Sequence, residues 1–338
     1  GQDGNAVRGL DAGGKRNHEW LAAADLVKYI EMMTGAKPRL AATRAEIDAA
    51  LKGKSPVILV GEEALRAKPD LTQRIRAAAK PKPLLAADAI GLVREGNRIY
   101  VAGNNDESHY FAAAELLGRW GCRWYLPTDF GECIPEVATL MVGTLDHVYG
   151  SPFEIRSYWI SWNGDNTGRA EFQRRNMMVS GRRGFPQTGH ALGRYTRDVP
   201  GSKGTFNFPI TAPETAAHIA GKIAPRFSKG EGISIGMEDG NYDSQYPKDV
   251  ELMKLQWDKY MMRWSVTDPM LELYNNIARI LQRQHPGSGG KLGFLAYANM
   301  TLPPVRPMKA EKSLFCELAP IDIDPIHGMD DEDSPPRQ

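Results

Sequence analysis

Two adjacent carboxylates follow a short apolar run in the second half of the chain. Residues 233–240 read ISIGMEDG, so a strand expected over 232–237 ends just before Glu238 and Asp239, with Asp243 close behind. In barrel enzymes the chemistry lies at the carboxyl ends of the strands, and paired carboxylates are what acid–base cleavage of a glycosidic bond requires. The alternative is a solvated acidic turn, because Asp-Gly pairs are common in turns. The pattern therefore favours a glycosidase site, with a plain turn as its rival.

Aromatic and basic residues stand near the ends of other expected elements. The aromatic residues that could stack on sugar rings are Tyr158, Trp159, Trp162, Tyr195, Tyr242, Trp257 and Tyr297. His190, which precedes Arg194 and Arg197, could hold a substrate hydroxyl or carboxylate, and Arg174 and Arg175 stand together in residues 172–178, FQRRNMM. Each feature has a structural alternative. Aromatic side chains pack barrel walls, a histidine can be structural, and a surface helix carries paired arginines without any function.

Helices and strands alternate in both halves of the chain. In the first half, apolar spacing predicts helices over 18–33 and 108–120 and strands over 56–60 and 97–103, with Gly35 ending the first helix. In the second half, strands are expected over 153–162, 205–210, 232–237, 290–298 and 313–319. Helices are expected there over 169–178, 213–227 and 270–284, the last capped by Asp268.

This alternation predicts an α/β fold in two domains. Residues 150–152, Gly-Ser-Pro, are the expected linker between an N-terminal α/β layer domain, residues 1–149, and a second domain, residues 150–338. Helices between successive strands favour parallel pairing by crossover, as in a (β/α)₈ barrel. About five strands follow Pro152, whereas a complete barrel has eight. The second domain is therefore expected to be an incomplete barrel in a truncated chain.

Composition excludes several classes of protein. The chain of 338 residues has 42 Lys and Arg against 41 Asp and Glu, a balance that argues against nucleic-acid binding. No apolar run is long enough to span a membrane. No signal peptide is visible; an extracellular or periplasmic location is expected, with the signal removed. The three cysteines are expected to be free thiols, and the absence of a zinc-binding motif such as CxxC favours no metal site. The sequence also lacks the GxGxxG and P-loop motifs that bind nucleotide cofactors.

Several segments resemble known families. Residues 21–35 (LAAADLVKYIEMMTG), 58–61 (ILVG), 98–105 (RIYVAGNN) and 117–135 (LGRWGCRWYLPTDFGECIP) resemble the N-terminal domain of family 20 β-hexosaminidases and family 67 α-glucuronidases. The second half is similar to the bacterial domain-of-unknown-function 4838 family, some members of which are family 163 endo-β-N-acetylglucosaminidases. The matching pieces there are FEIRSYW, FQRRNMM, the turn at His190, ISIGMEDG, KLGFLAYA and the tail LAPIDIDPIHGMDDEDSPP.

The resemblance implies a secreted bacterial glycoside hydrolase without a cofactor, acting on an oligosaccharide or glycoprotein glycan. The family commonly carries Asn-Asp-Gly where this chain has Glu238, Asp239 and Gly240, so the family's aspartate falls on Asp239. Laid over the family 20 order, Glu238 would orient a substrate acetamide and Asp239 would be the acid. The family's barrel also continues past the end of this chain. The predicted site comprises the catalytic pair Asp239 and Glu238 and the substrate-binding residues His190, Arg175, Asn176, Trp162, Tyr242 and Tyr297.

Two other functions remain open at this stage. An α-glucuronidase-like hydrolase would use Arg175, Arg194 and Arg197 to bind a substrate carboxylate. A non-catalytic carbohydrate-binding protein with a decayed barrel would explain both the unusual Glu-Asp order and the missing strands. These hypotheses differ in whether a glycan is cut and in whether it must carry a charge.

Overall fold

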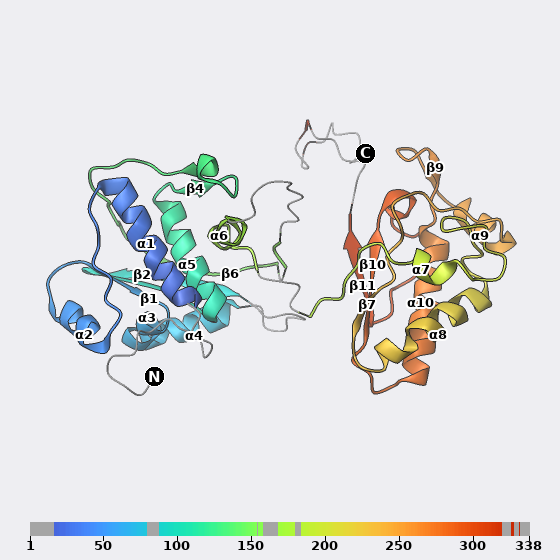
Figure 1. Ribbon diagram of the computed structural model, residues 1–338, viewed down its shortest axis with the longest axis horizontal. Helices are drawn as coiled ribbons and strands as arrows, with labels where there is room; N and C mark the ends of the chain where they lie inside the picture. Colours follow the sequence, from blue (N-terminus) through green and yellow to red (C-terminus); the bar gives the residue numbers. More distant parts are fainter. Residues whose placement is uncertain are drawn as a thin grey trace. The chain divides into compact units, whose positions relative to one another are not determined.

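The computed structural model is a mixed α/β structure that describes residues 17–79, 88–153, 155–157, 168–179, 184–319, 326–327 and 331. The chain divides into two compact units, residues 1–183 and 184–338 (Figure 1). The division therefore falls later in the chain than the boundary expected after residue 149. Trp162, one of the predicted substrate contacts, lies outside the described residues.

The first unit is built on a four-stranded mixed sheet. Its strand order is β1-β3-β2-β6, with β1 parallel to β3 and the other pairs antiparallel. The strands span Val57–Val60 (β1), Ala89–Glu95 (β2), Arg98–Gly103 (β3) and Asp146–Gly150 (β6). The patterns around β1 and β3 predicted these strands correctly, whereas β2 and β6 were not predicted.

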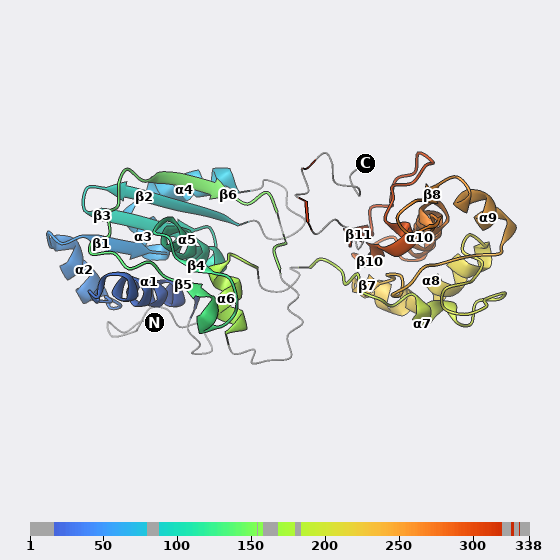
Figure 2. The same cartoon turned by 90° about the horizontal axis from the view of Figure 1, so that it is seen from above.

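Helices cover both faces of this sheet (Figure 2). Alternate strand residues face opposite sides, so Leu92 and Val101 pack with α1 and α5, whereas Val93 and Tyr100 pack with α3 and α4. The helices span His18–Thr34 (α1), Arg44–Lys52 (α2), Glu62–Ala67 (α3), Pro69–Ala78 (α4) and Asp106–Arg119 (α5). The prediction that α1 ends at Gly35 is confirmed, because this glycine is the left-handed C-cap with φ 71°.

Smaller elements complete the first unit. A hairpin of β4, Arg123–Trp124, and β5, Glu132–Cys133, encloses the 3₁₀ turn η1, Asp129–Gly131. Helix α6, Arg169–Arg175, packs against α5, and its Phe172 is buried in the same core. Strand β6 pairs with β2 up to Gly150, and α6 follows it in the same unit. These contacts are the reason that the division comes after residue 183.

The second unit contains a parallel three-stranded sheet in the order β11-β10-β7. Helices α8 and α10 pack on each other and on this sheet, around a core that includes Ile219, Ile277 and Phe294. The strands span Gly232–Ser234 (β7), Lys291–Ala296 (β10) and Leu314–Leu318 (β11). The helices span Gly193–Thr196 (α7), Pro213–Phe227 (α8), Pro247–Met253 (α9) and Thr267–Gln284 (α10), with the 3₁₀ turn η2 at Ala298–Met300.

The parallel pairing expected for this half is confirmed for β7, β10 and β11, but the described residues form no closed barrel. A single parallel bridge between His190 and Gly236 extends the sheet by one more segment beside β7. The strand expected over 205–210 is wrong, since this segment forms only one isolated parallel bridge, between Asn207 and Asp243. The buried Asp249 carboxylate accepts the Ile210 and Thr211 N–H groups, at 2.6 and 2.9 Å, so these groups are not available to a sheet partner. The strand expected over 153–162 is absent at Phe153 and at residues 155–157, and its other residues lie outside the description.

The structure also tests the expectations about Asp268 and about the cysteines. Asp268 does not cap α10 but lies in its first turn, where its carboxylate accepts the Val305 and Arg306 N–H groups at 2.8 and 3.1 Å. The three cysteines are free thiols, as expected. Among the described helices, none combines the length and apolarity that crossing a bilayer demands.

Candidate functional site

The predicted carboxylates lie beyond the carboxyl end of β7. The chain stays extended to the bridge at Gly236 and then turns, with the Gly240 N–H donating to the Glu238 carbonyl at 2.9 Å. Neighbouring side chains on a strand point to opposite faces, and the turn releases both residues from that constraint. Glu238 is half-buried and Asp239 is exposed.

Glu238 is held by the segment that follows His190. Its Oε1 atom accepts the backbone N–H of Gly193, the first residue of α7, at 2.9 Å. Its own N–H donates to the phenol oxygen of Tyr242, also at 2.9 Å. Burial raises the pKa of the Tyr242 phenol, so this residue stays neutral and acts as a fixed hydrogen-bonding partner. The Glu238 carboxylate therefore accepts a hydrogen bond from one neutral donor, and the hydrogen bond to Tyr242 holds its main chain in place.

Asp239 is held from the other side, by the residue that follows β10. The Tyr297 hydroxyl donates to Asp239 Oδ1 at 2.6 Å. This hydrogen bond to the carboxylate raises the pKa of Tyr297, because the neighbouring negative charge disfavours the phenolate. Two neighbouring parallel segments thus contribute one residue each to a single contact at the carboxyl edge of the sheet.

His190 completes this group. Its Nδ1 lies 2.5 Å from the Met237 carbonyl oxygen, and the centroid of its ring lies 5.8 Å from the centroid of the Tyr297 ring. A carbonyl oxygen only accepts, so Nδ1 carries the proton and Nε2 is left as an acceptor in the neutral ring. His190 is exposed, and Nε2 can therefore accept a hydroxyl proton from a molecule bound at this edge.

A buried asparagine that the sequence did not single out ties these loops together. Asn299, in η2, accepts the Tyr242 N–H at 3.0 Å and donates to the Tyr242 carbonyl at 2.8 Å. The same amide donates to the Trp264 carbonyl at 3.1 Å, and the Asn299 carbonyl accepts the Val266 N–H at 2.8 Å. Asparagine in a loop carries no sequence signal for such a role.

Two predicted substrate contacts belong to the first unit and are already engaged there. Arg175 donates through Nε to Asp25 at 3.1 Å and through a terminal nitrogen to Glu132 at 3.0 Å. Its side chain is 12% exposed and lies over the Tyr29 ring. Asn176 ends α6 and donates to the Trp124 and Phe172 carbonyls at 3.1 and 3.0 Å. Both residues stabilise the first unit by these contacts.

The carboxylate pair interacts with neutral groups. Within the described residues, neither Glu238 nor Asp239 forms an ion pair, and both accept hydrogen bonds from neutral groups. The same part of the chain contains no group of three or more His, Cys, Asp or Glu side chains that could hold a metal ion. The arrangement can donate or accept protons at an exposed edge.

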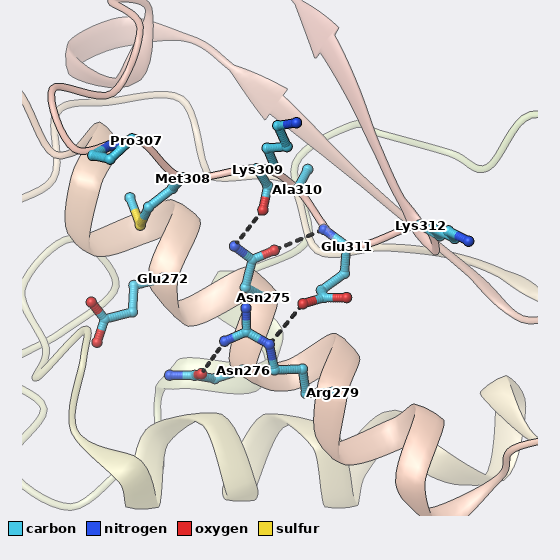
Figure 3. Close-up of a pocket in the computed structure, with 10 residues that line it drawn as sticks. All are labelled: Glu272, Asn275, Asn276, Arg279, Pro307, Met308, Lys309, Ala310, Glu311 and Lys312. Atoms are coloured by element: carbon cyan, nitrogen blue, oxygen red, sulfur yellow. Dashed lines mark hydrogen bonds and ion pairs between the residues drawn. The ribbon is translucent and has the colours of Figure 1, made fainter.

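Two hollows lie elsewhere in the structure. A pocket of about 650 Å³ lies between α10 and residues 307–312, where Asn275 and Arg279 bind the loop (Figure 3). Its polar groups bond to one another across the hollow, since Arg279 donates to both Glu311 and Asn276. A pocket of about 440 Å³ in the first unit is lined by residues of α3 and α4 and by Gly103 and Asn104. Neither is lined by a predicted site residue.

The turn after β1, where nucleotide-binding folds hold a phosphate, is occupied by the chain itself. The Glu19 carboxylate accepts the Glu62 N–H at 3.1 Å, at the start of α3. A Cβ at Gly61 would lie 2.6 Å from the Glu19 side chain. An internal anion at a helix start takes the place of an external one.

Comparisons with protein-family models, curated proteins and solved structures find no match to this chain.

Proposed function

We propose that the protein is a glycoside hydrolase whose reaction takes place at the carboxyl edge of the β7–β10 sheet. The observation that carries this proposal is the pair Glu238 and Asp239, two carboxylates without an ion-pair partner in the described residues, held by neutral donors at a strand end. A carboxyl group free of salt bridges is able to exchange its proton with a glycosidic oxygen. Structural carboxylates such as Asp249, by contrast, are buried and saturated with hydrogen bonds.

The roles of the two residues follow their surroundings. Asp239 is the more exposed and accepts the Tyr297 hydroxyl, whose ring lies beside that of His190, so it is assigned as the acid that protonates the leaving oxygen. Glu238 is fixed through Oε1 and its own N–H, which suits a group that orients a substrate. With a 2-acetamido sugar, that substrate group would be the acetamide, as in an endo-β-N-acetylglucosaminidase. The parallel sheet, with His190 beside β7, would belong to a (β/α)₈-type barrel.

The test is a screen of purified protein against N-glycoproteins and uronic acid oligosaccharides, with released sugars identified by mass spectrometry. Asp239→Asn is expected to lower kcat by about 100-fold or more, the usual loss for a general acid, without a change in folding. Asp243→Asn is the matched control, because Asp243 is exposed in the same loop and, among the described residues, its carboxylate accepts only the N–H of its neighbour Ser244. Full activity in Asp239→Asn, or no release from any glycan, would contradict the proposal.

A further inference from the structure

The carboxyl ends of β1 and β3 form a topological switch point in the first unit. These two strands are parallel neighbours in the sheet. The chain leaves β1 into α3 and leaves β3 into α5, and the two helices cover opposite faces of the sheet (Figure 2). Connections that diverge from neighbouring strands leave a crevice outside the strand ends, and open α/β sheets bind their ligands in this crevice.

The pocket of about 440 Å³ lies at this edge, where α3 and α4 meet the end of β3. Its volume is in the range of sites for small molecules. Leu65 and Ile75 give the pocket an apolar part, and Thr72 and Asn104 add a hydroxyl and an amide to its lining. The edge that the topology favours for a ligand therefore holds a hollow with both apolar and polar walls.

Two opposite charges line this pocket without pairing with each other. Glu62 and Arg76 are both exposed. Among the described residues, Arg76 forms no ion pair, and the carboxylate of Glu62 contacts only a histidine, His109. The third charged residue of the lining, Arg66, pairs with the buried Glu63, so its charge is already balanced. The pocket therefore presents one carboxylate and one guanidinium to a ligand.

A buried histidine orients the Glu62 carboxylate. His109, in α5, is 3% exposed, and its Nδ1 accepts the Gly103 N–H at 3.0 Å. Nε2 therefore carries the proton of the neutral ring and donates to Glu62 Oε1 at 3.2 Å. Burial lowers the pKa of His109, so the ring is neutral at pH 7 and leaves the negative charge of Glu62 uncompensated.

The surroundings of Glu62 argue against a phosphate ligand. The Glu62 N–H, at the start of α3, is already bound to the Glu19 carboxylate. Two carboxylates at this helix start would repel a third anion. A cationic group, by contrast, is attracted to Glu62, and the carboxylate of the same ligand is attracted to the planar guanidinium of Arg76.

We propose that this pocket binds a free α-amino acid with an apolar side chain. Its ammonium group would lie on Glu62, its carboxylate on Arg76 and its side chain against Leu65 and Ile75. A zwitterion matches one unpaired charge of each sign, which a singly charged ligand does not. The described lining contains no aromatic ring on which a sugar could stack. The inference concerns the first unit alone and does not depend on the proposed function.

Calorimetric titration of the full chain tests the site with four probes. L-leucine and L-phenylalanine are the amino acids, 4-methylpentanoate lacks the ammonium group of leucine, and 3-methylbutylamine lacks its carboxylate. We expect the amino acids to bind and each leucine analogue to bind at least tenfold more weakly than leucine, because each loses one charged hydrogen-bonding partner.

Three variants assign the two charges. Arg76→Gln and Glu62→Gln should each weaken the binding of L-leucine at least tenfold. Glu62→Gln keeps an acceptor for His109, and it should not weaken the binding of 4-methylpentanoate, which has no ammonium group. Arg74→Gln is the matched control, because Arg74 lies on the same helix, pairs with Asp146 and is absent from the described lining of the pocket. Its affinity for L-leucine should equal that of the unmodified protein.

Several outcomes would overturn the site. They are no binding of either amino acid, equal affinity for L-leucine and 4-methylpentanoate, and unchanged affinity for L-leucine in either glutamine variant of the pocket. Binding of glucuronate but of no amino acid would assign the pocket to a sugar acid instead. Circular dichroism that matches the Arg74→Gln protein shows that Arg76→Gln and Glu62→Gln are folded, so that a lost affinity reports on the pocket.

Discussion

Arg175 illustrates how a residue type that suggests substrate binding can serve the core of a fold. Its guanidinium joins Asp25 of α1 to Glu132 of β5 and covers the Tyr29 ring. Tyr29 and Tyr110 donate to the same two carboxylates. A half-buried cation that is shared by two acids from distant segments holds those segments together.

Removing this cation is expected to destabilise the protein. Arg175→Ala leaves Asp25 without an ion pair among the described residues and Glu132 with Lys28 alone, at 3.6 Å, and should lower the free energy of unfolding by about 3–5 kcal/mol. Arg119→Ala removes a surface pair with Glu115 and should cost about 0.5 kcal/mol or less. Urea unfolding of both variants measures the difference. If the Arg175→Ala protein has normal stability but no longer binds glycans, Arg175 is a substrate-binding residue rather than a structural one.

Tyr297 reports on the charge of Asp239. The carboxylate accepts its hydrogen bond and raises the pKa of the phenol, because a negative neighbour disfavours a second negative charge. Asp239→Asn removes that charge, so the pKa of Tyr297 should fall toward its ordinary value near 10. NMR titration of ¹³C-labelled tyrosine, assigned with Tyr297→Phe, measures the shift. An unchanged pKa in Asp239→Asn, or the same fall in Asp243→Asn, would mean that the contact does not form in solution.

At the scale of elements, the site depends on a close approach between two backbones. The segment before α7 lies so near β7 that a Cβ at Gly236 would be 2.0 Å from the Thr188 carbonyl oxygen. Glycine is needed there because no side chain fits. The contact brings His190 beside Met237 and Gly193 beside Glu238.

Gly236→Ala should therefore disturb the site and the fold together. The added methyl group must push two backbones apart, which costs about 1–3 kcal/mol, and His190 should lose its bond to Met237. Gly221→Ala is the matched control, because Gly221 is exposed on α8 with open space around it, and there alanine should add up to about 1 kcal/mol of stability. Thermal unfolding measures both. Equal stability in the two variants would contradict the close approach.

The elements that were predicted share a strong local signal. Helix α8 has proline in its first turn and apolar residues at helical spacing, and β10 and β11 are apolar runs. The expected strand at 205–210 is reduced to one bridge at Asn207, because Pro209 has no N–H and Asp249, distant in sequence, takes the Ile210 N–H. Glu238 and Asp239 were predicted from their place after a strand. Asn299 was not, because its role depends on loops that meet only in the folded chain.

At the scale of the whole molecule, the cores are separate. The buried clusters of the first unit draw on residues between Ala22 and Val179, and that of the second unit on residues between Leu192 and Leu314. No cluster among the described residues mixes the two units. Since burial of apolar surface is the main stabilising term, each unit has its own source of stability.

Two unfolding transitions are therefore expected in calorimetry. Leu92 on β2 and Leu281 on α10 are both fully buried, one in each unit. Replacing either by alanine removes packing worth about 2–5 kcal/mol, so Leu92→Ala should lower the temperature of one transition and Leu281→Ala that of the other. If both variants shift one common transition by the same amount, the units unfold together. Separate shifts would mean that the carboxylate edge of the second unit keeps its geometry while the first unit unfolds, because its hydrogen bonds among residues 190–299 lie within the second core.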